Sequence, residues 1–273
     1  MILIHNAITL VLLIAHFLGD YHFQSEELSE AKRKSHAALA RHLAIHGLLL
    51  FISWLLTWQS NMILLFSAVW LGHIIIDFLK VTLQRKWIFQ AEPIPYIYLI
   101  DQLLHISLIV VLSQVVFPAS GDVSVSIPTL VLKWTLLTVL ITKPANVTFK
   151  VLFNQYQNYT DDKVDQTEIV TVPGAGAMIG NLERILSAIF LSLSALSSIG
   201  LIYTAKSIAR FKLIEENQGF AEYYLIGTLF SILFCTCTYT PKKETIVTNM
   251  INNMIVNIFI LLIVLFPFFT SVH

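Results

Sequence analysis

The stretch Leu71-Gly72-His73-Ile74-Ile75-Ile76-Asp77-Phe78-Leu79-Lys80 closes an apolar run that begins near Met62. A run of about 18–20 apolar residues is long enough to cross a bilayer as a helix. Ionisable side chains inside such a helix are costly, so they usually face neighbouring helices and have partners there. His73 and Asp77 are four residues apart and therefore share one face of the predicted helix. The stretch predicts a membrane helix whose polar face is turned into a bundle.

Three more polar pairs with the same spacing lie in the first 105 residues. They are His16/Asp20, His42/His46 and Asp101/His105. Each of the four pairs belongs to an apolar run, and these runs cover about residues 2–21, 38–58, 62–78 and 96–117. We therefore expect residues 1–118 to form a bundle of four membrane helices with a polar core.

The basic residues of the short loops orient this bundle. Lys32, Arg33 and Lys34 follow the first span, Lys80, Arg85 and Lys86 follow the third, and the turn at 58–61 carries no charge. The positive-inside rule then places both basic loops in the cytoplasm and the amino terminus outside. At 1.5 Å per residue, all four pairs fall within a layer of about 10 Å near the cytoplasmic side. A common depth favours one shared site over four unrelated helix contacts.

Composition extends the membrane interpretation to the whole chain of 273 residues. The sequence is 56% hydrophobic and 12% charged, about half the charged share of a soluble domain. Residues 119–273 carry four further apolar runs and a cytoplasmic loop near 143–176. These predicted spans are 127–141, 177–205, 222–239 and 250–269. The sequence therefore predicts an all-α, polytopic membrane protein with about eight transmembrane helices.

Charge and cysteine content exclude some classes of partner and site. The formal net charge is zero, so nothing indicates nucleic acid as a partner. Cys235 and Cys237 lie two residues apart, where a helix points them to different faces, so they form neither a disulfide nor a metal motif. The expected surroundings are membrane lipid, and the sequence gives no indication of an oligomeric state.

The four pairs have the chemistry of a metal site. Imidazole and carboxylate together suit zinc, manganese and iron, and two ligands at i and i+4 are the arrangement that helical HExxH motifs use for zinc. One ion needs three or four protein ligands. Eight candidates therefore predict one or two divalent ions, zinc first and manganese or iron as alternatives. The candidate ligands are His16, Asp20, His42, His46, His73, Asp77, Asp101 and His105.

Other polar residues near this layer are candidates for catalysis. A carboxylate that binds no metal can serve as general base, glutamines can orient ligands or water, and lysines can receive an anionic group such as phosphate. These residues are Asp20, Asp101, Gln24, Gln102, Lys34 and Lys80. Two simpler interpretations stay open, because lysines also set membrane topology and polar pairs also join membrane helices.

These motifs resemble those of a bacterial inner-membrane family catalogued as a domain of unknown function. The matching stretches in the first half are His16-Phe-Leu-Gly-Asp20 with Gln24, His42 to His46, His73-Ile-Ile-Ile-Asp77 with Lys80, and Asp101-Gln-Leu-Leu-His105. Those in the second half include Glu183-Arg184, Lys206 to Arg210 and Glu222 to Thr228. The resemblance implies the bacterial cytoplasmic membrane. The His/Asp pairs also look like those of predicted membrane-bound metal-dependent hydrolases, an analogy of site type only.

Three functions compete. We prefer a metal-dependent hydrolase that acts on an amphipathic or phosphate-bearing substrate reached from the cytosol or the inner leaflet. The alternative is a transporter or channel for a divalent metal or protons. A carrier needs a site near the midplane that opens to both sides in turn, whereas these pairs gather toward one face. A membrane scaffold or sensor, in which the pairs only join helices, is the third possibility.

Overall fold

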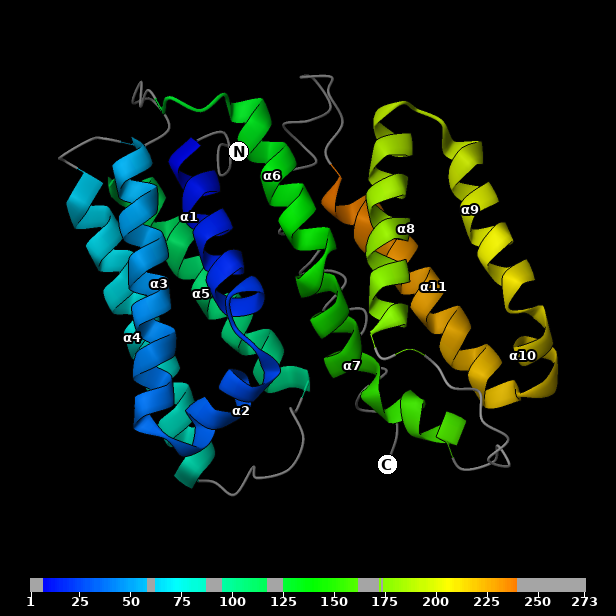
Figure 1. The fold of residues 1–273 in the computed structure, drawn as a ribbon. Helices are drawn as coiled ribbons and strands as arrows, with labels where there is room; N and C mark the ends of the chain where they lie inside the picture. The colour runs from blue at the N-terminus through cyan, green and yellow to red at the C-terminus, as the bar shows by residue number, and fades with distance from the viewer. Residues whose placement is uncertain are drawn as a thin grey trace. The chain divides into compact units, whose positions relative to one another are not determined.

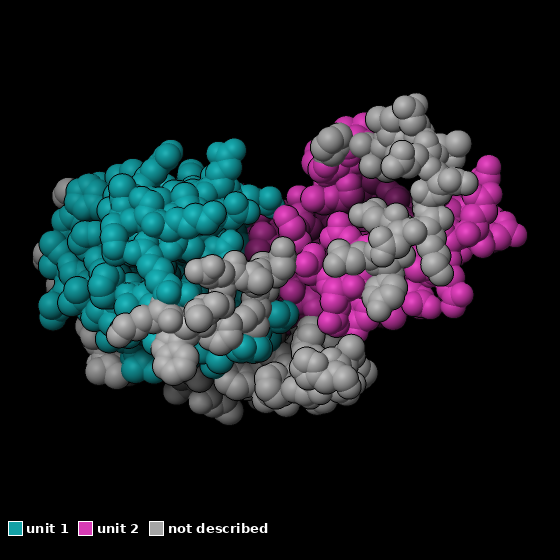
Figure 2. All heavy atoms as spheres, turned by 90° about the horizontal axis from the view of Figure 1, so that it is seen from below, with its two compact units in different colours: residues 1–139 teal, residues 140–273 magenta. Residues whose placement is uncertain are grey.

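The computed structural model of the protein describes residues 7–57, 62–86, 95–116, 125–161, 172 and 174–239. Within these ranges the chain forms helices and no strand (Figure 1), which confirms the all-α class. The chain divides into two compact units, residues 1–139 and 140–273, which we call unit 1 and unit 2 (Figure 2).

Within the described ranges, five helical segments are long and apolar enough to cross a membrane. They are His36–Thr57, Ile63–Arg85, Pro95–Ser113, Thr129–Gln157 and Gln218–Thr238. A sixth candidate is the pair Ala7–His22 and Glu26–Lys34, whose two parts meet at 87°. A multi-pass membrane protein is thus supported, but the count of eight spans is not confirmed. The eighth predicted span, 250–269, lies outside the described residues.

Unit 1 is a bundle in which α1 is central. Its helices are α1 (Ala7–Phe17), the π-helical turn η1 (Leu18–His22), α2 (Glu26–Lys34), α3 (His36–Thr57), α4 (Ile63–Lys86), α5 (Pro95–Val116) and most of α6 (Thr129–Ile141). Helix α1 packs against α3 and α5, and α4 packs against the same two helices. This confirms the four-helix bundle predicted for the first spans. The outer faces of α3 and α4 expose large apolar side chains such as Phe51, Leu64 and Phe78, as a lipid-facing surface requires.

Helix α2 occupies a stretch that the sequence analysis assigned to a charged loop. The Ser25 hydroxyl accepts a hydrogen bond from the Leu28 N–H at 3.1 Å and caps the helix. Acidic residues fill its first turn and basic residues its last, which suits the helix dipole. Only Leu28 and Lys32 of this helix are buried. Because they are four residues apart, α2 lays one face against α3 and α4.

Unit 2 contains the remaining helices of the described part of the chain and is built around α11. These helices are α7 (Lys143–Asp161), α8 (Ala175–Ser192), α9 (Leu196–Ala209), α10 (Phe211–Glu216) and α11 (Gln218–Thr238). The predicted loop near 143–176 therefore begins as a helix. Helix α7 packs Phe149 and Phe153 against Phe230 of α11, with ring centroids 5.4 Å and 5.6 Å apart. This apolar contact explains why the start of the predicted polar loop forms helix α7.

The single span predicted over 177–205 is wrong, because this stretch is a helical hairpin. Helix α8 ends at Ser192, α9 begins at Leu196, and the two lie side by side in opposite directions (Figure 1). Ser194 between them has a φ of 58°, in the left-handed region that reverses the chain. Lys206 Nζ lies 2.8 Å from Glu183 Oε2, so it has returned toward the start of α8.

The hairpin removes a conflict in the predicted topology. A single span over 177–205 would put Lys206 and Arg210 on the opposite side from the start of that span, against the positive-inside rule. With two antiparallel helices, these basic residues return to the side on which α8 starts.

This return can be tested by cysteine labelling in a Cys235→Ser/Cys237→Ser background. We expect Gly176→Cys and Lys212→Cys, both at exposed positions, to react with an impermeant maleimide from the same side of sealed vesicles of one orientation. Reaction of the two cysteines from opposite sides would restore the single span.

Candidate metal centre

The eight candidate ligands lie together in one buried cluster in the core of unit 1. Each of four helices contributes one pair, and α1 does so through its extension η1. Their side chains are 8% exposed or less. The cluster comprises His16, Asp20, His42, His46, His73, Asp77, Asp101 and His105. The residues that the sequence grouped by their i,i+4 spacing and common depth are therefore neighbours in the structure.

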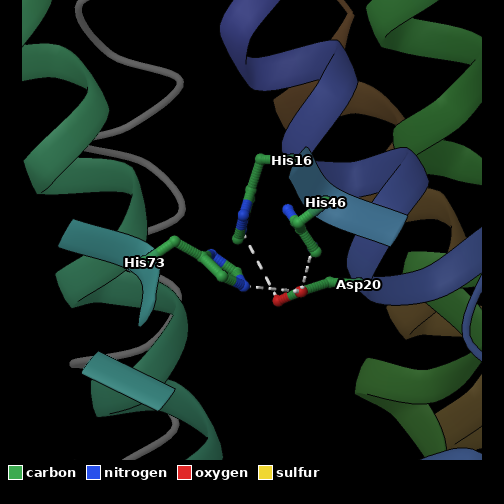
Figure 3. A group of neighbouring side chains, drawn as sticks. All are labelled: His16, Asp20, His46 and His73. Carbon is green, nitrogen blue, oxygen red and sulfur yellow. Dashed lines mark hydrogen bonds and ion pairs between the residues drawn. The ribbon is translucent and has the colours of Figure 1, made fainter. Parts of the chain in front are cut away.

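Three histidines converge on Asp20 (Figure 3). The Asp20 carboxylate lies 2.8 Å from His46 Nε2, 3.8 Å from His16 Nε2 and 3.9 Å from His73 Nε2. One ligand atom from each of these four residues lies within 4.8 Å of the others. We call His16, Asp20, His46 and His73 the histidine-rich group.

A second group gathers around Asp77. Ligand atoms of Asp77, Asp101 and His105 also lie within 4.8 Å of one another, and we call them the carboxylate-rich group. His42 lies between the two groups, with its Nε2 3.5 Å from Asp20 Oδ1 and 3.1 Å from Asp77 Oδ2. A third set, His42, His73 and Asp77, overlaps both groups. The donors thus form one continuous array.

The carboxylate-rich group passes a test of fit for a cation. His105 Nδ1 lies 2.9 Å from the Asp101 carbonyl oxygen. A carbonyl can only accept, so Nδ1 carries the proton and Nε2 presents a lone pair. Among the described residues, that buried Nε2 has no hydrogen-bond partner, and neither has Asp101 Oδ1. Nε2 faces Asp77 Oδ1 at 4.0 Å, a separation that one ion with ligand bonds of about 2.0–2.2 Å can bridge.

Gly19 makes the close approach of α3 to η1 possible. A Cβ atom at this position would overlap the His46 imidazole. Without a side chain, the backbone beside Asp20 comes near enough for His46 to reach the carboxylate at 2.8 Å. The His46 ring in turn stacks on that of His73 with centroids 3.8 Å apart. The glycine in the His16-Phe-Leu-Gly-Asp20 motif is therefore part of the site geometry.

An apolar collar closes the cluster on one side. Each collar residue is four residues from one histidine of the cluster. The polar partner of that histidine is four residues away in the other direction along the chain, as in Leu12, His16 and Asp20. The collar residues are Leu12, Leu50, Val69 and Ile109, all 4% exposed or less. Together with four histidines they line a cavity of about 10 Å³, about the space of one water molecule.

Lysines lie on the other side of the cluster, and one of them was missed. Lys32 Nζ is 3.4 Å from Asp77 Oδ2, and Lys80 Nζ is 2.6 Å from Asp101 Oδ2. The prediction of Lys80 near the site is therefore consistent with its contact, whereas Lys34 is exposed at the end of α2. The i,i+4 pair Leu28/Lys32 is the signal that would have identified Lys32.

The other predicted polar residues have distinct positions. Gln102 Nε2 donates to Asp20 Oδ2 at 3.1 Å, and its Oε1 lies 3.4 Å from His16 Nε2, so it braces the histidine-rich group. Gln24 is half-buried in the turn between η1 and α2. Arg85 donates to the Arg33 carbonyl at 2.8 Å and joins the end of α4 to that of α2.

The polar residues of unit 2 make structural contacts with one another. Glu183 pairs with Lys206. Buried Arg184 donates to the carbonyl oxygen of Ile141 and, at 2.6 Å, to Asn146 Oδ1. It also contacts Ser231 Oγ of α11 at 3.3 Å. Within unit 2, one guanidinium thereby joins Ile141, Asn146 of α7 and Ser231 of α11 to α8.

Comparison with known proteins finds a family model that resembles part of the first half of the chain. Residues 8–136 match the model of a family described as Protein of unknown function (DUF3307). The match confirms the resemblance to an uncharacterised family, and the matched residues include all eight candidate ligands. Comparisons with curated proteins and with solved structures found no match.

The role of Gly19 can be tested with Gly19→Ala. We expect a lower Tm and a loss of bound metal, because overpacking costs about 1–3 kcal/mol and here displaces a candidate ligand. Gly200→Ala is the matched control, since nothing lies within 4 Å of a Cβ there and alanine favours a helix. Metal content by mass spectrometry and thermal melting in detergent measure both effects. Equal metal content in the two variants would contradict this role.

Proposed function

We propose that this protein is a membrane-embedded metal-dependent hydrolase. The observation that carries the proposal is the presence of two donor groups that share no residue. The histidine-rich group supplies three imidazoles and one carboxylate, and the carboxylate-rich group supplies two carboxylates and one imidazole. Neighbouring metal ions are a common arrangement in enzymes that hydrolyse phosphoesters and peptides.

The donor types favour particular ions. Imidazoles with a single carboxylate suit zinc, and a set richer in carboxylates also accepts manganese or iron. A bound ion would supply a Lewis acid and a water molecule of lowered pKa. The residues of this chain would hold the ions and orient the carboxylates, as Gln102 does for Asp20 at 3.1 Å.

Access from one side supports a hydrolase over a carrier. The collar closes the array on one side, while exposure increases toward the lysines, where the Lys80 side chain is 21% exposed. An enzyme needs one entrance, whereas a carrier needs two that open in turn. With the predicted orientation, this entrance faces the cytoplasm and admits an amphipathic or phosphate-bearing substrate.

Metal content of the detergent-purified protein is the first test. We expect one or two zinc, manganese or iron ions per chain, and their loss in His73→Ala/Asp77→Ala, because these two residues between them belong to every donor set. His36→Ala, at an exposed histidine of the same unit, is the control and should keep the metal. A folded wild type without metal, even after reconstitution, would remove the basis of the hydrolase.

Activity assays separate the three functions. We expect the metal-loaded wild type in nanodiscs to hydrolyse members of a panel of phosphate and carboxylate esters, and the double variant to be inactive. Proteoliposomes should take up zinc no faster than empty liposomes. Metal uptake that depends on His73 would instead favour the transporter. A protein that is stable without metal and shows neither hydrolysis nor metal uptake would favour the scaffold.

A further inference from the structure

Two lysines hold the two carboxylates of the carboxylate-rich group in the same way. The ammonium group of Lys32 contacts the Oδ2 atom of Asp77, and that of Lys80 contacts the Oδ2 atom of Asp101. The other oxygens lie toward His105: Asp77 Oδ1 is 4.0 Å from Nε2, and Asp101 Oδ1 is 3.8 Å from Nδ1. Asp77 therefore presents one oxygen to an ammonium group and the other to the lone pair of His105, and Asp101 Oδ1, which Lys80 does not contact, lies beside the same imidazole.

The orphaned atoms identify the inner side of this arrangement as the place for a ligand. Asp101 Oδ1 and His105 Nε2 are buried and have no hydrogen-bond partner in the part of the chain that the structure describes. Buried polar atoms without partners are rare in folded proteins, and an ion would satisfy both. The lysines lie on the outer oxygens and leave this place free.

Charge distinguishes the two donor groups. Within the described part of the chain, Asp20 makes ion-pair contacts only with histidines, so the histidine-rich group is negative when its imidazoles are neutral. In the carboxylate-rich group, two ammonium groups balance two carboxylates. A divalent ion would therefore be attracted to the first group, whereas in the second it would create a strong excess of buried positive charge.

An oxyanion would remove that excess. Phosphate carries negative charge and several acceptor oxygens, and lysine ammonium groups bind it as point charges. Lys32 and Lys80 already lie beside the metal donors, so a phosphate group bound there would meet ammonium groups next to the ion. No other described cations lie this close to the donor array.

We propose that the histidine-rich group holds a resident transition metal, whereas the carboxylate-rich group takes a second divalent ion together with a phosphate group bound by Lys32 and Lys80. This inference rests on the proposed hydrolase and names its substrate class as phosphate esters. It also assigns Lys32, which comes from the amphipathic helix α2, to substrate binding.

The test is a manganese titration of detergent-purified protein that holds its resident metal, followed by electron paramagnetic resonance of free Mn²⁺. In the wild type, inorganic phosphate should tighten binding of the second ion about tenfold or more, as compensation of a nearby unit charge can do. In Lys32→Gln the second ion should bind more tightly without phosphate, and phosphate should add little. The resident metal should be unchanged. Lys34→Gln, at an exposed lysine of the same helix, should match the wild type.

The outcomes separate this inference from the proposed function. Absence of a resident metal would overturn both. A resident metal with a second ion that binds equally with and without phosphate, and equally in Lys32→Gln and Lys34→Gln, would overturn the inference and leave the hydrolase standing. Should Lys32→Gln unfold, Lys80→Gln is read by the same criteria.

The source of the phosphate group is resolved by changing the bilayer. Nanodiscs containing phosphatidic acid and nanodiscs of phosphatidylcholine alone are titrated without inorganic phosphate. Tighter manganese binding only with phosphatidic acid would support a lipid headgroup. No effect of phosphatidic acid, together with tighter binding on addition of inorganic phosphate in the detergent titration, would support a soluble ester. A response to neither would overturn the inference.

Discussion

Three carboxylates buried in an apolar bundle impose the constraint on which unit 1 depends. An unpaired charge in such a place is strongly destabilising, so each carboxylate needs partners from other helices. Asp20 of η1 is met by side chains of α3 and α5, Asp77 of α4 by α2 and α3, and Asp101 of α5 by α4. These contacts run between helices rather than within them. The polar core therefore fixes which helices are neighbours, and the lipid-facing surfaces need only be apolar.

The four-residue spacing converts this set of contacts into layers. Along each helix, one turn separates a collar residue from a histidine, and a further turn separates that histidine from its polar partner. Because neighbouring helices run in opposite directions, the order of residues reverses from one helix to the next while the layers stay aligned. The array thus has an apolar end, a histidine layer, a layer of carboxylates with His42, and a lysine end. Such polarity is what a site with a single entrance requires.

The bundle and its eight polar residues were predictable because periodicity and depth are properties of the sequence. Helix α2 was not recognised, since its short, charged run has only Leu28 and Lys32 on the buried face, and Lys34 was chosen in place of Lys32 for that reason. The hairpin of α8 and α9 was missed because the apolar run continues through a turn that one residue, Ser194, makes with a positive φ. The unpaired atoms of His105 and Asp101 depend on side-chain orientation, which no spacing rule encodes.

The collar has an electrical consequence. A layer of leucine, valine and isoleucine side chains has a low dielectric constant, so with the proposed entrance on the lysine side a transmembrane voltage would fall largely across it. If substrates enter from the lysine side, as we propose, the donor array lies on the near side of that layer and would stay close to the electrical potential of the water there. An ion or a phosphate group that enters from there crosses little of the field, which otherwise is worth about 2.3 kcal/mol per charge for each 100 mV. Occupancy of the centre should then be set by concentration in one compartment and not by the energised state of the membrane.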